Sequence, residues 1–196
     1  MKILIDNGHG NNTPGKRSPD STFFEWQFNR EISIAVCQEL KRRGYDVELI
    51  VTEDTDVSLG ERCRRVNAVC NDVGRTNVLL VSIHANAAGK GNWSTARGFS
   101  VFVYTEASIR ARNLAQCLYA EAYSRGMRGN RSVPPTHYWE ARFYILKNTR
   151  CPAVLTENLF YDNREDLAIL KSEQGKRQIV DLHVEGIISY IEGYEN

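Results

Sequence analysis

The sequence lacks the features that mark several large classes of protein. Its 196 residues carry 25 basic and 24 acidic side chains, a net charge of only +1, so neither nucleic acid nor an anionic membrane is expected as its main partner. No apolar run approaches the ~18–20 residues that cross a bilayer, so no membrane insertion is expected. The amino terminus enters a predicted strand without the zones of a signal peptide. We therefore expect cytoplasmic accumulation with export by a separate route, or a domain excised from a longer secreted enzyme.

Cysteine is sparse and irregularly spaced. The sequence contains Cys37, Cys63, Cys70, Cys117 and Cys151 and no Cys-x-x-Cys pair. An odd number with this spacing argues against both a disulfide framework and a thiolate metal site. Four of the five lie in helix-like patterns, where free cysteine behaves as a small buried apolar residue.

Two common cofactor motifs are also missing. Gly8 and Gly10 follow the first apolar run, but Thr13 stands where a dinucleotide-binding fingerprint needs its third glycine. No Gly-Lys-Ser/Thr follows, so a phosphate-binding P-loop is excluded as well. What remains is a histidine, His9, between two glycines that allow the backbone to approach a ligand closely.

The patterning predicts a single α/β domain over residues 1–196. Apolar runs separated by helical periodicity favour a mostly parallel, twisted sheet of about six strands flanked by helices on both faces. Strands are predicted at Lys2–Asp6, Asp46–Val51, Asn77–Ile83, Gly98–Tyr104, Phe143–Lys147 and Pro152–Thr156. Helices are predicted from Phe24 to Leu40 with Gly44 as C-cap, from Ser58 to about Asp72, through Leu114 to about Arg125, and through Ile179 to Ile191. Residues 126–142 read as irregular.

Two of these apolar runs end in a histidine. His9 follows the first predicted strand and His84 follows the third. Open α/β sheets build their sites at the carboxyl ends of strands, and neutral imidazoles are common transition-metal ligands. A single histidine at a strand end is more commonly a structural residue. As a pair, His9 and His84 leave both interpretations open.

Two carboxylates could complete such a site. Glu25 lies at the start of the first predicted helix, although Thr22-Phe-Phe-Glu25 also matches a capping box, which local sequence favours. Glu157 follows the last strand, where it could shuttle protons. The other histidines have simpler interpretations: His137 as a solvated loop residue and His183 as a packed helix residue.

Five motifs in order resemble the zinc-dependent N-acetylmuramoyl-L-alanine amidases of the amidase-3 type, across nearly the whole chain. The motifs are Asp6-Asn-Gly-His9-Gly, Glu25 with Asn29, Ser58-Leu59 with Arg62 and Asn67, Ser82-Ile-His84-Ala-Asn86, and Pro152-Ala-Val-Leu-Thr-Glu157 with Phe160, Asn163 and Asp166. The chain departs from the family pattern at Asn7, where proline is usual, and at Asn158 and Leu159, where a small residue is usual. The short segment 126–142 stands where some relatives carry an inhibitory helix, so an uncovered site is expected.

The resemblance implies a ligand set and a reaction. His9, Glu25 and His84 would bind Zn²⁺, and Glu157 would be the catalytic carboxylate that hydrolyses the amide between N-acetylmuramic acid and L-alanine in bacterial peptidoglycan. It also implies a stand-alone, endolysin-like catalytic domain, expected as a monomer. The alternatives are a zinc peptidase or small-amide deacylase on a similar fold, and a non-catalytic cell-wall-binding module.

Overall fold

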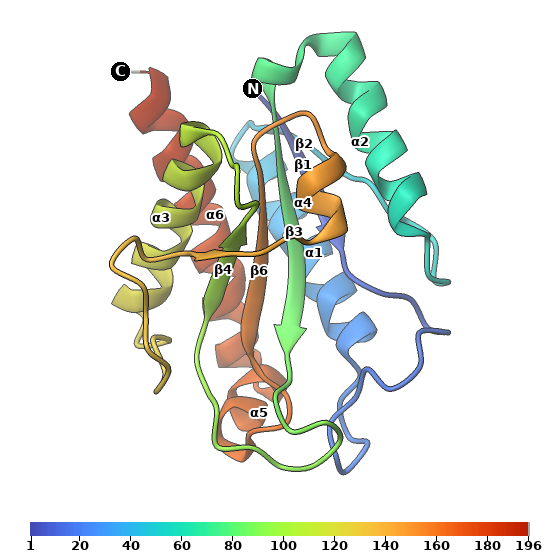
Figure 1. Cartoon of the computed structure of the whole chain (residues 1–196), viewed down its shortest axis with the longest axis vertical. Helices are drawn as coiled ribbons and strands as arrows, with labels where there is room; N and C mark the ends of the chain where they lie inside the picture. Colours follow the sequence, from blue (N-terminus) through green and yellow to red (C-terminus); the bar gives the residue numbers. More distant parts are fainter. Residues whose placement is uncertain (196) are drawn as a thin grey trace.

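The computed structural model describes residues 1–195 and contains one six-stranded sheet (Figure 1). Its strands are β1 (Lys2–Asn7), β2 (Asp46–Leu49), β3 (Val78–Asn86), β4 (Ser100–Val103), β5 (Trp139–Glu140) and β6 (Ala153–Phe160). Their order across the sheet is β2-β1-β3-β6-β4-β5. The near-continuous apolar sequence of β3 predicts a central strand, and β3 does lie between β1 and β6.

The sheet is mixed, with one antiparallel pair. Strands β2, β1, β3 and β6 pair in parallel, as do β4 and β5, but β4 is antiparallel to β6. The predicted mostly parallel sheet is therefore confirmed, with one exception that has a simple cause. No helix lies between β3 and β4, so the chain turns back at the same end of the sheet, as antiparallel strands permit.

Helices cover both faces, as predicted. The helices are α1 (Glu25–Arg42), α2 (Leu59–Val73), η1 (Arg75–Asn77), α3 (Ile109–Ser124), α4 (Tyr144–Asn148), α5 (Arg164–Lys171) and α6 (Glu173–Glu195). Helices α1, α3 and α6 contribute to one core, and α2 and α4 contribute to the other. In Figure 1, α4 lies in front of the sheet and α6 behind it. No helix within residues 1–195 is long and apolar enough to cross a membrane.

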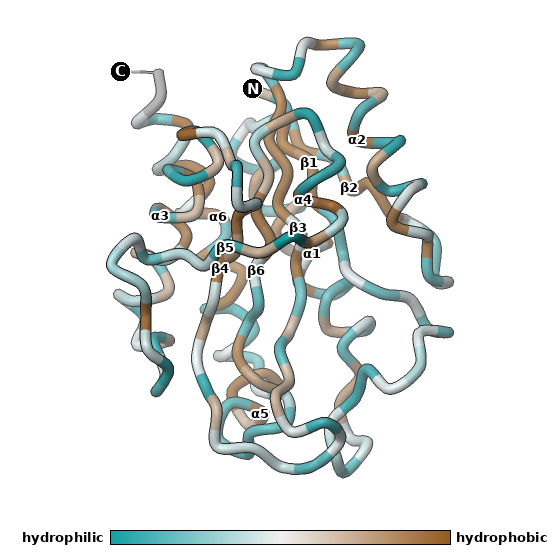
Figure 2. The backbone as a smooth tube through the Cα atoms, in the orientation of Figure 1, coloured by the Kyte–Doolittle hydropathy of each residue, from teal (hydrophilic) through white to brown (hydrophobic). Residues whose placement is uncertain are grey.

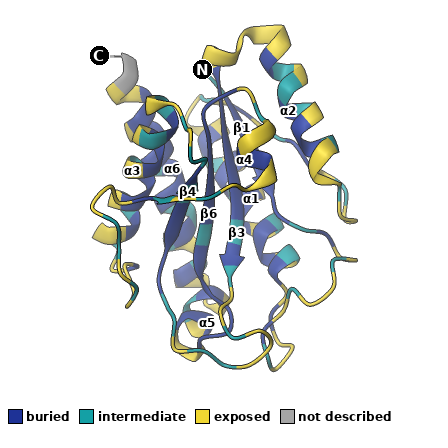
Figure 3. Ribbon diagram, in the orientation of Figure 1, coloured by how far each residue is buried: buried dark blue, intermediate teal, exposed yellow. Residues whose placement is uncertain are grey.

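Strand alternation separates these two cores. On β1, Ile3 and Ile5 pack with α1, whereas Leu4 between them packs on the opposite face with α2. Figures 2 and 3 show the result: the strands are apolar and buried, while the outer sides of α2 and α4 are exposed. This burial fixes which side chains reach each face at the carboxyl ends of the strands.

The predicted strand Phe143–Lys147 is wrong, because this segment forms helix α4. Ile145 and Leu146 are both buried although they are consecutive, which a strand with one buried face cannot achieve. The side chains of Asn148 and Thr149 also donate hydrogen bonds to the carbonyls of Tyr144 and Ile145, closing the last turn. Short apolar runs do not distinguish helix from strand by periodicity.

Smaller differences concern boundaries and two missed elements. Strands β3 and β6 extend beyond their predicted ends, so His84 and Glu157 lie within strands rather than just after them. The segment 126–142 contains the short strand β5 but no helix. Helix α5 precedes the predicted carboxyl-terminal helix. Gly44, with φ of 87°, follows α1 as the predicted C-cap glycine.

Candidate active site

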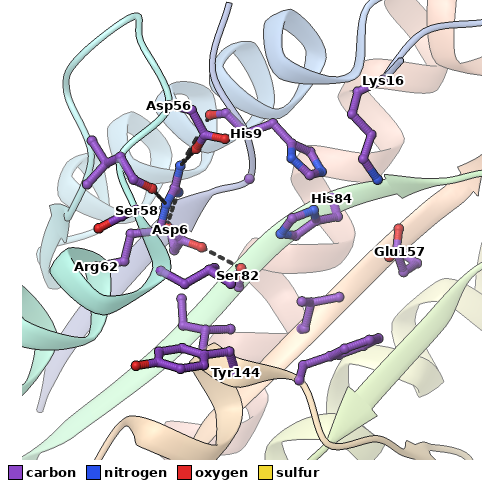
Figure 4. Close-up of a pocket in the computed structure, with 16 residues that line it drawn as sticks. Asp6, His9, Lys16, Asp56, Ser58, Arg62, Ser82, His84, Tyr144 and Glu157 are labelled. Atoms are coloured by element: carbon purple, nitrogen blue, oxygen red, sulfur yellow. Dashed lines mark hydrogen bonds and ion pairs between the residues drawn. The ribbon is translucent and has the colours of Figure 1, made fainter. Parts of the chain in front are cut away.

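A pocket of about 410 Å³ opens at the carboxyl ends of β1, β3 and β6 (Figure 4). One wall is polar and includes Asp6, His9 and Arg62. The opposite wall is apolar and comes partly from α4, where Tyr144 is half exposed. The pocket therefore combines ionisable groups with an apolar surface, as small-molecule sites commonly do.

Three of the predicted site residues converge beside this pocket. Glu25 Oε1 lies 3.3 Å from His9 Nε2 and 3.2 Å from His84 Nδ1. Ligand atoms of the three residues all lie within 4.8 Å of one another. Two imidazoles and one carboxylate gathered in this way are compatible with a metal site.

Glu25 reaches the cluster from the first turn of α1. The predicted capping box is wrong: the N-cap is Phe24, which makes no side-chain cap, and the Thr22 hydroxyl donates instead to Asp20. The Glu25 side chain is buried and accepts a hydrogen bond from the Ala85 amide at 3.3 Å. Burial opposes ionisation, but hydrogen bonds with the two histidines outweigh it and hold the pKa of Glu25 well below its usual range. Glu25 is therefore an anion aimed between two imidazoles.

His9 lies on a loop whose backbone is strained, with φ of 66°. Its carbonyl accepts hydrogen bonds from Arg30 and Arg62, both at 3.3 Å. The neighbouring Gly10 packs so tightly that a Cβ there would lie 2.0 Å from the Asp56 amide nitrogen. The loop thus holds His9 by close backbone contact and by arginine donors, and only glycine fits at position 10.

Arg62 is the centre of a buried polar network under this loop. Its guanidinium donates to Asp6 Oδ1 at 2.6 Å and to Asp56 Oδ1 at 3.0 Å, and it also binds the Asn7 carbonyl. Asp6 in turn accepts from the Ser82 hydroxyl at 2.5 Å. The network ties β1, β3 and α2 together at the edge of the pocket.

His84 is held by the sheet itself. It lies near the end of β3, and a Cβ on Gly8 would come within 2.0 Å of His84 Cε1. Asn158 Nδ2 donates to the His84 carbonyl at 2.8 Å. The next residue, Leu159, has φ of 61°, where the family pattern usually has a small residue. Leu159 thus differs from the family pattern at a position with a left-handed backbone, next to the register shift between β3 and β6.

Glu157 stands next to His84 across the sheet. The two residues are register partners on β6 and β3, and both line the pocket. Glu157 Oε2 is buried without a hydrogen-bond partner. Burial, and then the charge of Glu25, raise the pKa of Glu157 well above its usual value, while Lys16 and Arg131 oppose the rise. A carboxyl group in this environment keeps its proton to a higher pH than an exposed one, as acid and base groups in active sites commonly do.

The other two histidines lie outside the cluster. His137 is an exposed loop residue stacked on Tyr119, with ring centroids 5.4 Å apart. His183 is buried in α6, as predicted, with Nδ1 2.7 Å from the Ile179 carbonyl and Nε2 2.9 Å from the Thr156 hydroxyl.

Arg62 belongs to one of the sequence motifs, but the sequence does not reveal its partners. The pairing of Asp6 with Arg62 joins residues 56 positions apart, and no local pattern encodes it. Other motif residues also serve the framework: Asn29 donates to the Gly8 carbonyl, and Asp166 accepts from the amides of Gly98 and Phe160. The sequence does carry one sign of these contacts: several polar residues fall on or beside otherwise apolar strands, and buried polar groups need hydrogen-bond partners.

Comparison with known proteins identifies the family. A family model described as N-acetylmuramoyl-L-alanine amidase matches residues 3–189. The endolysin of Bacillus phage SPP1 is 30% identical over 192 residues, which cover 94% of this chain and 64% of the endolysin. The CwlM N-acetylmuramoyl-L-alanine amidase of Bacillus licheniformis is 28% identical over 192 residues, which cover 95% of this chain and 67% of CwlM.

Solved structures agree. The N-acetylmuramoyl-L-alanine amidase from Clostridium difficile 630 superposes with a TM-score of 0.82 at 28% identity, covering 98% of this chain and 97% of that one. The catalytic domain of CwlV from Bacillus (Paenibacillus) polymyxa var. colistinus gives 0.80 at 25% identity, covering 98% and 99%. The predicted α/β fold and enzyme class are thereby confirmed, and the chain belongs to the N-acetylmuramoyl-L-alanine amidase family of hydrolases.

Proposed function

We propose that the chain hydrolyses the amide bond between N-acetylmuramic acid and L-alanine in bacterial peptidoglycan. In this proposal His9, Glu25 and His84 hold Zn²⁺, and Glu157 serves as the general acid and base. The observation that carries this proposal is the pairing of His84 with Glu157 across β3 and β6. It sets an unpartnered carboxylate oxygen beside the only three-residue cluster with metal-ligand geometry found within the described chain.

The residues present fit a zinc ion. Two histidines and one carboxylate are the ligand set of several catalytic zinc sites, and such a set leaves one position open. The second carboxylate oxygen, Glu25 Oε2, is buried without a hydrogen-bond partner and lies 3.9 Å from Lys16 Nζ. Bound zinc supplies Lewis acidity, which polarises a carbonyl group and lowers the pKa of water.

The chain's own groups then divide the remaining work. Glu157 accepts a proton from the attacking water at its carboxylate and returns that proton to the departing alanine nitrogen. Arg62 and Arg30 keep the His9 loop in place through its carbonyl. Phe143, Tyr144 and Ile145 give one side of the pocket an apolar lining. No observation favours the peptidase, deacylase or wall-binding alternatives.

The test is mass spectrometry of purified peptidoglycan digested by the protein, with and without a chelator. The expected products carry new free amino termini on L-alanine, chelation abolishes them, and added zinc restores them. In Glu157→Gln, kcat is expected to fall roughly a thousandfold while zinc content stays unchanged. His137→Gln serves as the matched control and keeps wild-type activity. Digestion without new alanine amino termini contradicts the proposal.

The similarity to the SPP1 endolysin supports a lytic role, in which the protein acts on the wall after release from the cell. We expect the protein to act as a monomer. We expect the protein to lyse cells only when it is added from outside or is expressed together with a membrane-permeabilising partner. Size-exclusion chromatography with light scattering checks the mass against 22.3 kDa.

A further inference from the structure

Arg131 is a fixed cation close to the reaction site. Its Nη1 donates to the Ser100 hydroxyl at 2.6 Å. Its guanidinium carbon lies 5.1 Å from the centroid of Trp139 and 5.5 Å from that of Phe160. None of the ion pairs found among the described side chains involves Arg131. Arg131 is therefore oriented by aromatic rings and a hydroxyl, and its charge remains available to a ligand.

The sheet register places Arg131 beside Glu157. His84 pairs with Glu157, and Glu157 pairs in turn with Ser100, so the three form one row across β3, β6 and β4. Ser100 lies between Phe99 and Val101, which pack into the core on the opposite face. Ser100 therefore points to the same face as Glu157. Because Arg131 is bonded to Ser100, it flanks Glu157 on the side away from the histidines.

The order of groups in this row fixes the direction of the substrate. The carbonyl that is attacked belongs near the histidines, and the departing nitrogen belongs near Glu157, which protonates it. The amine half of the substrate, which is the peptide, then continues past Glu157 over β4. Lys16, the other cation close to Glu157, already lies 3.9 Å from the buried carboxylate of Glu25.

We propose that Arg131 anchors the peptide by binding a carboxylate on the residue that follows L-alanine. This assignment rests on the proposed function. Neighbouring strands are ~4.8 Å apart, and one extended residue spans ~3.5 Å, so the group one strand beyond Glu157 meets the substrate about one residue beyond the alanine. A guanidinium suits this task because it binds a carboxylate through two parallel hydrogen bonds.

Two synthetic substrates test this assignment. N-acetylmuramoyl-L-alanyl-D-isoglutamate and N-acetylmuramoyl-L-alanyl-D-isoglutamine, each with its γ-carboxyl group blocked as the methylamide, differ only in an α-carboxylate against an α-carboxamide. The wild-type protein is expected to favour the carboxylate about tenfold in kcat/KM, the size of a charge-assisted hydrogen bond. Arg131→Gln is expected to remove this preference by raising KM for the carboxylate substrate, leaving the carboxamide substrate within about twofold. Arg131→Lys recovers part of the preference.

Several results would overturn the assignment. Equal kcat/KM of the wild type for both substrates does so without any variant. An equal loss on both substrates in Arg131→Gln, or a loss confined to kcat, would show that Arg131 only supports Glu157 or the fold. If Arg131→Gln does not fold, the same comparison of the two substrates is made with Arg131→Lys. Failure of the proposed function looks different: the wild type then cleaves neither substrate at the alanine amide.

Discussion

The two histidines of the candidate site share one chemistry but are held in different ways. His84 lies in a central strand, against Gly8 of the neighbouring chain segment, and its position follows from the sheet. His9 lies on a loop with a left-handed backbone and is fixed by polar contacts from Arg30 and Arg62. The histidine on the strand is therefore positioned by close packing within the sheet, whereas the histidine on the loop is positioned by a buried hydrogen-bond network.

Removing either imidazole is expected to have the largest effect. His9→Ala and His84→Ala should each weaken zinc binding by about a thousandfold or more, since each removes one of three ligands. Competition with a coloured chelator measures this. The two variants should differ in the metal-free protein: His84→Ala lowers the free energy of unfolding by about 1–2 kcal/mol through lost packing, and His9→Ala leaves it nearly unchanged. Equal losses would show that the two histidines are held in the same way.

Arg62→Met is expected to have the next largest effect, on stability. It leaves buried Asp6 without its cation, and breaking a buried ion pair costs about 3–5 kcal/mol. Denaturant unfolding of the metal-free protein measures the loss. Arg64→Met in the same helix is the matched control, because Arg64 pairs with Glu61 at the surface and its loss should change stability by less than about 1 kcal/mol. Similar losses in both variants would contradict a special role for the network.

The free energy of unfolding is expected to fall in acid because of His183, which contacts β6, the strand that carries Glu157. The Ile179 carbonyl can only accept, so His183 Nδ1 carries the hydrogen and Nε2 accepts from Thr156, the residue before Glu157. Burial lowers the pKa of His183 from 6.5 to about 4. The unfolded chain thus binds a proton that the folded one excludes, so stability is lost as pH falls from 6.5 to 4.

The size of this effect is about 3 kcal/mol at pH 4 relative to pH 7. Urea unfolding at a series of pH values measures it, and His183→Gln should flatten the slope over that window. The exposed His137→Gln leaves the slope as it is. A slope unchanged in His183→Gln would show that other groups cause the acid sensitivity.

The smallest effect is expected at the rim of the His9 loop. The Thr13 hydroxyl donates to Asp56 Oδ2 at 2.6 Å and accepts from the Gly10 amide at 3.0 Å. Thr13→Val removes both contacts at a half-buried position and should cost about 1 kcal/mol in stability and a few-fold in zinc affinity. Calorimetry measures the change in stability, and zinc titration measures the change in affinity. A loss only in stability would show that the loop rim does not position His9.

The sequence alone predicts most of the framework. Apolar alternation and caps such as Ser58, which accepts from the Glu61 amide, locate five strands and the long helices because these signals are local. The segment Phe143–Lys147 is missed because its two buried residues fit either structure. The positions of His9, His84 and Glu157 at strand ends single them out as candidates, and motif resemblance supplies their roles. Glu25 comes from the resemblance alone, because local sequence misassigns it as a cap. Arg62 with Asp6, and Arg131 with Ser100, depend on contacts between distant segments, which no local pattern reports.

The row that runs from His84 through Glu157 to Ser100 separates two kinds of evolutionary constraint. Its first two members lie in central strands, where a substitution disturbs neighbours on both sides. Its last member connects to residues 126–142, which join the sheet through only two pairs, Phe102 with Trp139 and Val103 with Glu140. Substitutions can therefore change the residues at this edge of the sheet while His84 and Glu157 keep their neighbours.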